Sequence, residues 1–379
     1  MRYRFETEEH VAFRKSLRKY IASEIAPQYD TWEKEGKIPK SVWKKMGEMG
    51  YLCPQVEERF GGLGLDYRYN VIISEELERV GSSLVGFGLH SDIVVPYIES
   101  FANEEQKQRW LPGCVTGEII TAIAMTEPGA GSDLAGIVTT AVRDGDHYIV
   151  NGSKTFISNG INSNVVIVVV VTDPSAGHKG ISLLVVEDGT PGFTKGRKLE
   201  KVGQHAQDTA ELFFDQCRVP VTNLLGEEGK GFYYLMQKLQ QERLGVAITS
   251  VIAMEEMLEM TIDYVKTRKA FGQPISRFQN TQFKLAEMAI EVEMGKAFVE
   301  KLIQQHMEDQ DIVTSVSMAK YKLSEQARQM AVECLQLHGG YGYMEEYKIA
   351  RRYRDLAVLP IYAGTNEIMK TIIAKNLGL

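Results

Sequence analysis

The sequence is poor in features that would stabilise or anchor a small or membrane-bound protein. Cysteine occurs only at positions 53, 114, 217 and 334, and no two of these cysteines form a CxxC pair or stand in a Cys/His cluster. We therefore expect four reduced thiols, no disulfide framework and no metal site. There is also no stretch of about 18 consecutive apolar residues, so the sequence predicts no integral membrane segment.

Basic residues are not in excess either. The 379 residues include 43 Lys and Arg against 50 Asp and Glu, which gives a formal net charge of −7. We expect no binding of nucleic acid through a broad basic surface, and an anionic ligand must be bound by local donors. The first residues, MRYRFETEEH, are acidic where a signal peptide would be apolar. We expect a bacterial cytoplasmic protein, or a mitochondrial matrix protein whose targeting peptide has been removed.

What is present is the balance of a globular chain, with 44% hydrophobic and 25% charged residues. Apolar residues recur every three or four positions from Thr7 to about Leu111, which predicts helices. Short β-branched runs then predict strands at 119–125, 137–142, 148–150, 165–171, 181–186 and 212–214. Helical periodicity returns after Gly231, in stretches at 232–269, 276–308, 311–338, 345–357 and 364–377.

The order of helices, strands and helices predicts an α+β fold with three domains, at 1–115, 116–225 and 226–379. Tight turns are predicted at Asp144-Gly145-Asp146 and at Asn151-Gly152. A parallel sheet of the dinucleotide-binding type is disfavoured, because the Gly-rich residues 129–132 lack the GxGxxG spacing and precede a strand-like stretch.

Five segments combine glycines with hydroxyl, amide or cationic side chains. They are AMTEPGAGSD at 124–133, NGSKTFISNG at 151–160, RKAFGQPI at 268–275, QLHGGYGY at 336–343 and IYAGTNEI at 361–368. Such segments let a ligand approach the backbone and offer donors to phosphate or carbonyl oxygens. Alternation along the second segment places Phe156 and Ser158 on one face of a strand. Taken singly, each segment is explained equally well by turns, strand packing or helix capping.

In this order and at these separations the five segments resemble the acyl-CoA dehydrogenase family, and the resemblance covers essentially the whole chain. It implies an N-terminal helical domain, a middle antiparallel β domain and a C-terminal four-helix bundle. It also implies a homotetramer with FAD at a subunit interface, and an electron-transfer flavoprotein as electron acceptor.

The resemblance further implies α,β-dehydrogenation of an acyl-CoA thioester to a trans-2-enoyl-CoA. In the family a carboxylate removes the α proton while the β hydrogen leaves as hydride to flavin N5. The enolate-like charge on the thioester oxygen requires donors placed in advance, which in the family are a backbone N–H and a ribityl hydroxyl of FAD. The carboxylate must stand in a dry apolar pocket that raises its pKa toward working pH.

One position departs from the commonest pattern of the family. The catalytic glutamate usually occupies the third position of the IYxGT segment, where this chain has Ala363. In the long-chain and isovaleryl-CoA branches the glutamate comes instead from a QERL-like segment at the start of the first long C-terminal helix. Residues 241–244 read QERL, so the resemblance makes Glu242 the expected base. Without that context, Glu242 would be explained by the helix dipole acting on an exposed first-turn acid.

The resemblance also implies the remaining site residues. The expected FAD contacts are Met125, Thr126, Gly131, Ser132, Phe156, Ser158, Arg268, Phe271, Gln279, Gln336, Gly339, Gly340, Thr365 and Glu367. Phe156 replaces the tryptophan common in the family, and Ser158 replaces its threonine. The six residues from Arg268 to Gly340 are expected at the adenine and pyrophosphate end, contributed to a neighbouring subunit. The expected substrate contacts are Ser132, Arg243, Tyr362, Ala363 and Gly364.

Several functions are compatible with this pattern. The QERL and IYAGTNEIMK segments favour a medium- or long-chain acyl-CoA, while the isovaleryl-type branch shares the relocated base. An acyl-carrier-protein dehydrogenase on the same fold is a second enzyme hypothesis. The alanine at position 363 leaves a third, a catalytically silent subunit that serves in assembly, although the intact flavin segments and Glu242 argue against it.

Overall fold

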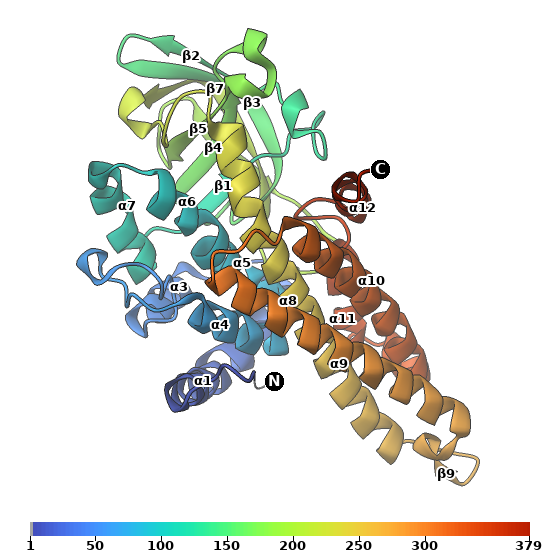
Figure 1. The fold of residues 1–379 in the computed structure, drawn as a ribbon. Coiled ribbons are helices and arrows are strands. Elements are labelled where there is room, and N and C mark those ends of the chain that lie inside the picture. The colour runs from blue at the N-terminus through green and yellow to red at the C-terminus, as the bar shows by residue number, and fades with distance from the viewer. Residues whose placement is uncertain (1–2) are drawn as a thin grey trace.

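A computed structural model describes residues 3–379 of the chain, and Figure 1 shows a β sheet at the top of the view, above two groups of helices. The first group comprises α1 (Glu8–Tyr20), α2 (Tyr29–Glu35), α3 (Lys40–Glu48), α4 (Tyr67–Val80), α5 (Val85–Gly88), α6 (Val95–Phe101) and α7 (Glu104–Thr116). Local sequence sets the ends of these helices. At the start of α7, Asn103 and Gln106 exchange side-chain-to-backbone hydrogen bonds of 2.9 and 3.0 Å, a capping box.

The sheet contains β1 (Thr121–Ala124), β2 (Thr140–Asp144), β3 (His147–Ser158), β4 (Val165–Val171), β5 (Ile181–Glu187), β6 (Phe193–Lys198) and β7 (Thr209–Pro220). Their order is β1-β4-β2-β3-β7-β6, with β5 also paired to β4. The expectation of a purely antiparallel domain is wrong, because β4 pairs in parallel with β1, where Thr121 lies opposite Val165, and with β2, where Val171 lies opposite Thr140. The chain crosses between them through β2 and β3, so the sheet is mixed.

The predicted turn at Asn151-Gly152 is also wrong. Both residues lie inside β3, where the pairing with β7 shifts register between Val150 and Gly152. A Cβ on Gly152 would stand 2.5 Å from Thr139 Oγ1, so glycine is needed here for close approach of the backbone rather than for a turn. The turn at Asp144-Gly145-Asp146 is confirmed, with Gly145 at φ 63°. β6 was not predicted, because its sequence FTKGRK lacks a β-branched run.

The β-branched run of β4 explains how the sheet is positioned. Ile167 and Val169 belong to the core shared with the first group of helices, whereas Val166 and Val168 belong to a separate core within the β layer. Since successive side chains of a strand point to opposite faces, a strand buried on both faces needs an unbroken apolar sequence. This packing fixes β1, which leads into residues 124–133, and β3, which contains most of residues 151–160, relative to the helices.

The second group of helices comprises α8 (Gly231–Thr267), α9 (Gln279–Met307), α10 (Val313–His338), α11 (Lys348–Asp355) and α12 (Asn366–Asn376). In Figure 1, α8 runs from the sheet to the far end of the bundle, where the short hairpin of β8 (Lys269–Ala270) and β9 (Gln273–Pro274) connects it to α9. Secondary structure changes between Thr116 and Thr121 and between Pro220 and Gly231. The division at 115 and 225 stays a prediction.

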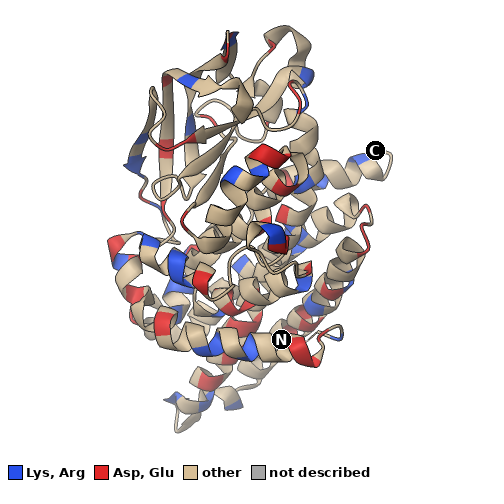
Figure 2. Ribbon diagram, turned by 90° about the vertical axis from the view of Figure 1, so that its left-hand side faces the viewer, with Lys and Arg blue, Asp and Glu red and all other residues tan. Residues whose placement is uncertain are grey.

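Buried ion pairs connect the three parts. The Arg352 guanidinium of α11 is 1% exposed and donates to Glu78 of α4 and Glu256 of α8. Asp355 accepts a hydrogen bond of 2.5 Å from the Gln204 N–H, in the segment between β6 and β7. Elsewhere Lys and Arg are interspersed with Asp and Glu along the helices, as Figure 2 shows. No helix within residues 3–379 is long and apolar enough to cross a membrane.

Candidate active site

Glu242 lies in the interior of α8, eleven residues beyond Gly231, where that helix begins. The explanation of Glu242 as a first-turn acid is therefore wrong, because the dipole effect fades beyond the first turn. Its Oε2 atom is buried and has no hydrogen-bond partner within residues 3–379. Burial raises the pKa of Glu242 to about 7, although the nearby charges of Arg243 and Lys320 lower it. The carboxyl group can thus hold or release a proton near neutral pH.

Residues 361–364 form a turn beside Glu242. Ala363 is in the left-handed region with φ 55°, which costs a non-glycine residue conformational energy. Its carbonyl accepts a long hydrogen bond of 3.5 Å from Arg243 Nε, and the Gly364 carbonyl accepts one of 2.7 Å from Lys320 Nζ. Within the described chain, the Ala363 N–H makes no hydrogen bond, so it is free to donate to a ligand.

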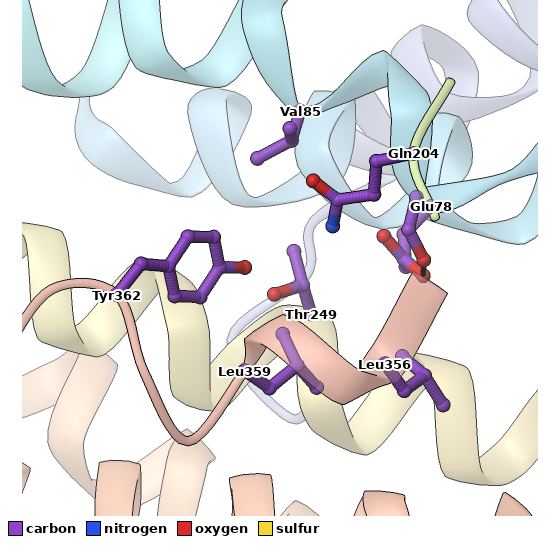
Figure 3. Close-up of a pocket in the computed structure, with 8 residues that line it drawn as sticks. Glu78, Val85, Gln204, Thr249, Leu356, Leu359 and Tyr362 are labelled. Atoms are coloured by element: carbon purple, nitrogen blue, oxygen red, sulfur yellow. Dashed lines mark hydrogen bonds between the residues drawn. The ribbon is translucent and has the colours of Figure 1, made fainter. Parts of the chain in front are cut away.

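Tyr362 borders a small cavity on the side of this turn. Figure 3 shows its hydroxyl directed into the cavity, toward Gln204 and Thr249. The cavity measures about 10 Å³, which is room for a single water molecule, and polar side chains share its lining with Val85, Leu356 and Leu359. Burial, together with the charges of Glu78 and Glu242, raises the pKa of Tyr362, so this hydroxyl stays neutral at physiological pH.

Met125 and Thr126 lie where β1 ends and a turn begins. The Thr126 carbonyl accepts from Thr155 N–H of β3 at 2.9 Å, and the Met125 carbonyl accepts from Lys154 Nζ at 3.1 Å. Lys154 also pairs with Glu127 at 2.8 Å, and both side chains are buried. The segment is thereby fixed to β3, so its remaining polar groups have defined directions.

Phe156 and Ser158 follow on β3, but alternation alone does not place them. The pairing of β3 with β7 shifts register between Lys154 and Ile157, and Phe156 adopts φ 60° within this bulge. The Phe156 ring is 68% exposed and Ser158 is half-buried, whereas Ile157 between them is buried. An exposed ring on a strained residue is an unusual arrangement unless something covers it.

Gly131 and Ser132 are exposed in the turn that follows β1. A Cβ placed on Gly131 would meet no atom of the chain within 4 Å. Packing within the chain therefore does not require glycine at this position. A ligand that lies against the backbone would require it.

A second group of expected residues lines an open groove of about 480 Å³ at the end of α8 and α10. The groove brings Arg268, Gln336, Gly339 and Gly340 together. Gly339 ends α10 with φ 60° and ψ −140°, a conformation essentially limited to glycine. The Arg268 guanidinium lies 5.4 Å from the centroid of the Tyr341 ring, so a cation stands on one wall.

Phe271 and Gln279 flank this groove without lining it. Phe271 is at the tip of the β8–β9 hairpin, where it is 95% exposed and has φ 49°. Gln279 is the first residue of α9 and is also exposed. Figure 1 shows the hairpin at the end of the bundle farthest from the sheet. Within one chain, Phe271 and Gln279 therefore lie far from Phe156 and Ser158.

Thr365 and Glu367 lie at the start of α12. The Thr365 hydroxyl accepts from Ile368 N–H at 3.3 Å and so caps the helix, while Glu367 is exposed in its first turn. Both are close in sequence to the turn of residues 361–364. Helix capping accounts for Thr365 within the chain. The exposed side chain of Glu367 is accessible to a ligand.

Comparison with known proteins identifies the family. Models of the acyl-CoA dehydrogenase N-terminal, middle and C-terminal domains match residues 7–118, 122–217 and 229–378. The chain belongs to the acyl-CoA dehydrogenase family. A long-chain specific acyl-CoA dehydrogenase of Sus scrofa mitochondria is 50% identical over 99% of this chain and 87% of its own. An acyl-CoA dehydrogenase of Bacillus subtilis is 39% identical, covering 98% of each chain.

Among solved structures, an acyl-CoA dehydrogenase from Geobacillus kaustophilus is 64% identical, covers the whole of both chains and superposes with a TM-score of 0.99. The predicted fold of helical, β and helical domains is confirmed by these matches. The protein is accordingly an FAD-dependent oxidoreductase, as members of this family are.

The two groups of side chains fit FAD chemically. Phe156 and Phe271 offer exposed aromatic faces, and Arg268 offers a cation to a pyrophosphate in the groove. Gly340 resembles Gly131, since a Cβ on it would meet nothing within 4 Å. FAD binding thus explains glycines and exposed rings that the chain itself leaves unexplained.

Three groups near the site are not among the residues predicted from the sequence. Lys320 is fully buried and holds the Gly364 carbonyl, and Lys154 with Glu127 fixes the turn after β1. Tyr97 has a buried hydroxyl that finds no hydrogen-bond partner among the described residues. Glu127 and Lys154 lie in two of the five segments, so their opposite charges could have suggested an ion pair between these segments. Lys320 and Tyr97 lie in ordinary helical sequence, which carries no such signal.

Proposed function

We propose that this acyl-CoA dehydrogenase oxidises medium- or long-chain acyl-CoA thioesters to trans-2-enoyl-CoA, with Glu242 as the base. The observation that carries the proposal is the buried Oε2 of Glu242, which has no hydrogen-bond partner within the described residues and belongs to a group with a pKa of about 7. A structural glutamate would be paired, because an unsatisfied buried carboxylate is costly. A base that must accept a proton from carbon needs a free oxygen.

The turn beside Glu242 supplies the complementary group. The Ala363 N–H is free, and the carbonyls of Ala363 and Gly364 are held by Arg243 and Lys320. An N–H so fixed can donate to the thioester oxygen and stabilise the charge that builds there as Glu242 takes the α proton. FAD, when bound, supplies the hydride acceptor. Position 363 needs no side-chain acid in this arrangement.

The substrate class rests on the relatives. The Sus scrofa protein, 50% identical over nearly the whole chain, is named for long-chain substrates, and it supports a medium or long acyl chain here. The isovaleryl-type alternative differs in the branching and length of the acyl group. An acyl-carrier-protein thioester differs in the carrier. Both alternatives are distinguishable by the choice of thioester in one assay.

The test is anaerobic bleaching of the flavin absorbance by a panel of esters from isovaleryl-CoA to palmitoyl-CoA. Wild type is expected to bleach fastest with a medium- or long-chain ester, and Glu242→Gln is expected to retain flavin without bleaching. Glu259→Gln is the matched control, because Glu259 lies on the same helix with a side chain 61% exposed. Equal bleaching by Glu242→Gln would exclude Glu242 as the base. Bleaching only by carrier-protein thioesters would exclude the CoA substrate.

We further propose that the protein works as a homotetramer and passes electrons to an electron-transfer flavoprotein. Phe283, Ile290 and Met294 of α9 are 57%, 58% and 62% exposed, and their spacing of seven and four residues places them on one helix face. An exposed apolar face of this kind favours contact with another copy. The separation of the two groups of FAD-binding residues in one chain favours the same conclusion.

Replacing Ile290 and Met294 together with glutamate tests the oligomer. Light scattering should then show a species smaller than a tetramer, and flavin content should fall because the groove no longer meets a second subunit. A matched control replaces two exposed polar residues, Glu293 and Gln304, with glutamine and glutamate. A double variant that stays tetrameric would contradict the assignment of this face. Reduction of an electron-transfer flavoprotein by the substrate-reduced wild type tests the acceptor.

A further inference from the structure

Lys320 of α10 is a fully buried ammonium group without an ionic partner. Its residue exposure is 0%, and no carboxylate oxygen of residues 3–379 lies within 4.0 Å of its Nζ atom. The other fully buried lysine, Lys154, has Glu127 at 2.8 Å. Burying a charge without a paired charge costs free energy, so a purely structural position would favour an apolar residue. The retained charge at Lys320 therefore calls for an explanation in function.

The hydrogen bonds of Lys320 lead to the turn beside Glu242. Its Nζ donates to the Gly364 carbonyl at 2.7 Å and to Asn366 Oδ1 at 3.1 Å. Ser324, one turn further along α10, donates to the same Asn366 oxygen at 3.2 Å. The Gly364 carbonyl belongs to the second peptide after the one that carries the Ala363 N–H, and the Ala363 carbonyl held by Arg243 belongs to the peptide between them.

Two cations thus hold two successive carbonyls of one turn. Arg243 holds the Ala363 carbonyl from α8, and Lys320 holds the Gly364 carbonyl from α10. The contact from Arg243 is long, at 3.5 Å, whereas the one from Lys320 is short, so Lys320 is the stronger of the two constraints. Holding these carbonyls toward the bundle also stabilises the positive φ of Ala363.

We propose that Lys320 is a positioning residue for the dehydrogenation: it fixes the Ala363 N–H through the Gly364 carbonyl and places a positive charge behind Glu242. This rests on the proposed function. The charge favours the ionised form of Glu242 before proton transfer, and it favours the negative thioester oxygen afterward. Lys320 touches neither substrate nor reacting atoms and acts through the turn.

The groups that face Glu242 come from four parts of the chain. Arg243 is on its own helix, Lys320 is on α10, Tyr97 is on α6, and Tyr362 is on the turn. Of these, the two cations lower the pKa of Glu242, while the two tyrosines are neutral because their own pKa values are raised. Glu367 of α12 acts on Lys320. Removing the Lys320 charge should therefore move the acidic limb of the activity profile to higher pH.

The experiment compares Lys320→Met, Lys320→Gln and the matched control Ser324→Ala in the flavin-loaded, full-length enzyme. Met removes the charge and the donor, and Gln keeps a donor without charge. Ser324→Ala keeps Lys320 and removes the hydroxyl that bonds Asn366 Oδ1 and the Tyr321 carbonyl. The readouts are kcat and KM against pH, and the carbonyl stretching frequency of bound enoyl-CoA, which reports polarisation by the Ala363 N–H.

For Lys320→Met we expect kcat to fall by about 10- to 100-fold, the acidic limb to move to higher pH, and the carbonyl stretch to return toward its value in water. Lys320→Gln should move the limb equally but recover part of kcat and of the carbonyl shift. Ser324→Ala should leave the limb in place. Wild-type profiles and an unchanged carbonyl stretch in a flavin-loaded Lys320→Met enzyme would overturn the proposal.

If Lys320→Met does not fold, Lys320→Gln decides the matter alone, since an unmoved acidic limb in that variant also overturns the proposal. Failure here is separable from failure of the proposed function. If wild type bleaches with acyl-CoA and Glu242→Gln does not, while Lys320 variants behave as wild type, only the role of Lys320 is wrong. If no acyl-CoA bleaches wild type, the proposed function itself is wrong.

Discussion

Glu127 is buried and Glu242 is half-buried with a buried Oε2 atom, and their pKa values move in opposite directions. Burial alone would raise the pKa of Glu127, but hydrogen bonds from Lys154, Thr139 and Val138 outweigh burial and lower it. At Glu242 burial raises the pKa to about 7, and Oε2 receives no hydrogen bond from the described residues. Three donors reach the carboxylate of Glu127 and lower its pKa, whereas burial dominates at Glu242.

The difference corresponds to two uses of a buried acid. Glu127 accepts 2.7 and 2.9 Å bonds from backbone N–H groups and one of 2.8 Å from Lys154, so its oxygens are occupied and it fixes the turn after β1. Glu242 keeps an oxygen free and stands beside a free N–H. A satisfied carboxylate stabilises structure, and an unsatisfied one remains able to take a proton.

The largest expected effect separates the two glutamates by activity. Glu242→Gln should reduce the rate of flavin reduction by acyl-CoA by about 10²- to 10⁴-fold, the usual contribution of a general base, while flavin content is unchanged. Stopped-flow absorbance measures this rate. An equal loss of activity in Glu259→Gln, the exposed control on α8, would show that the effect is not specific to Glu242.

The second prediction separates them by stability. Glu127→Gln should lower the free energy of unfolding by about 3 to 5 kcal/mol, because it leaves the Lys154 ammonium buried and unpaired. Urea unfolding of the enzyme at pH 7.5 measures the loss. The double variant Glu127→Gln with Lys154→Met should recover much of it. If the double variant is no more stable than the single one, the pairing does not explain the position.

The third prediction is a pH dependence with opposite signs. The pKa of Glu242 is raised in the folded state, so ionisation of this carboxyl group destabilises the fold. The free energy of unfolding of the wild type should therefore fall as pH rises from the ordinary pKa of 4.5 to about 7. The free energy of unfolding of Glu242→Gln should therefore equal that of wild type below this pH range. Above pH 7 it should be higher than that of wild type, by up to about 3 kcal/mol. Thermal unfolding across pH 4.5 to 8 shows the divergence.

Glu127 should behave in the opposite way, because its pKa is lowered in the folded state. It contributes stability above pH 4.5 that is lost as pH falls through the folded-state value, so the advantage of wild type over Glu127→Gln should shrink in acid. If stability plotted against pH runs parallel to wild type for both Glu242→Gln and Glu127→Gln, the surroundings shift the pKa of neither carboxyl group.

The smallest expected effect concerns the turn between the two cations. Ala363→Gly should raise the free energy of unfolding by about 1 kcal/mol, since φ 55° costs alanine more than glycine. Ala357→Gly, at an exposed position outside the turn, is the matched control and should be neutral or destabilising. A destabilised Ala363→Gly would mean that Lys320 and Arg243 do not impose this conformation.

The sequence supports part of this account directly. The β-branched run at 165–171 identified β4 because a strand buried on both faces needs apolar residues throughout. The same logic missed β6, whose six residues include three cations and a glycine. It also assigned a turn to Asn151-Gly152, because glycine required for close approach to Thr139 reads the same as glycine required for a turn.

For the site, sequence reasoning led to Glu242 through the alanine at position 363, but it placed Glu242 in a first helical turn. The predicted helix at 232–269 begins within one residue of the observed start at Gly231, so its own bounds already placed Glu242 beyond the first turn. The free Oε2, the free Ala363 N–H and the buried Lys320 depend on how α8, α10 and the turn meet in space. Periodicity along one chain carries no information about such contacts.

The most direct test of the central claim is exchange of the α hydrogen of an acyl-CoA with deuterated water, followed anaerobically by mass spectrometry. The account predicts that wild type and Glu259→Gln exchange this hydrogen at similar rates, that the rate rises through about pH 7, and that Glu242→Gln does not exchange it. Exchange by flavin-loaded Glu242→Gln at the wild-type rate would contradict the assignment of Glu242 as the base.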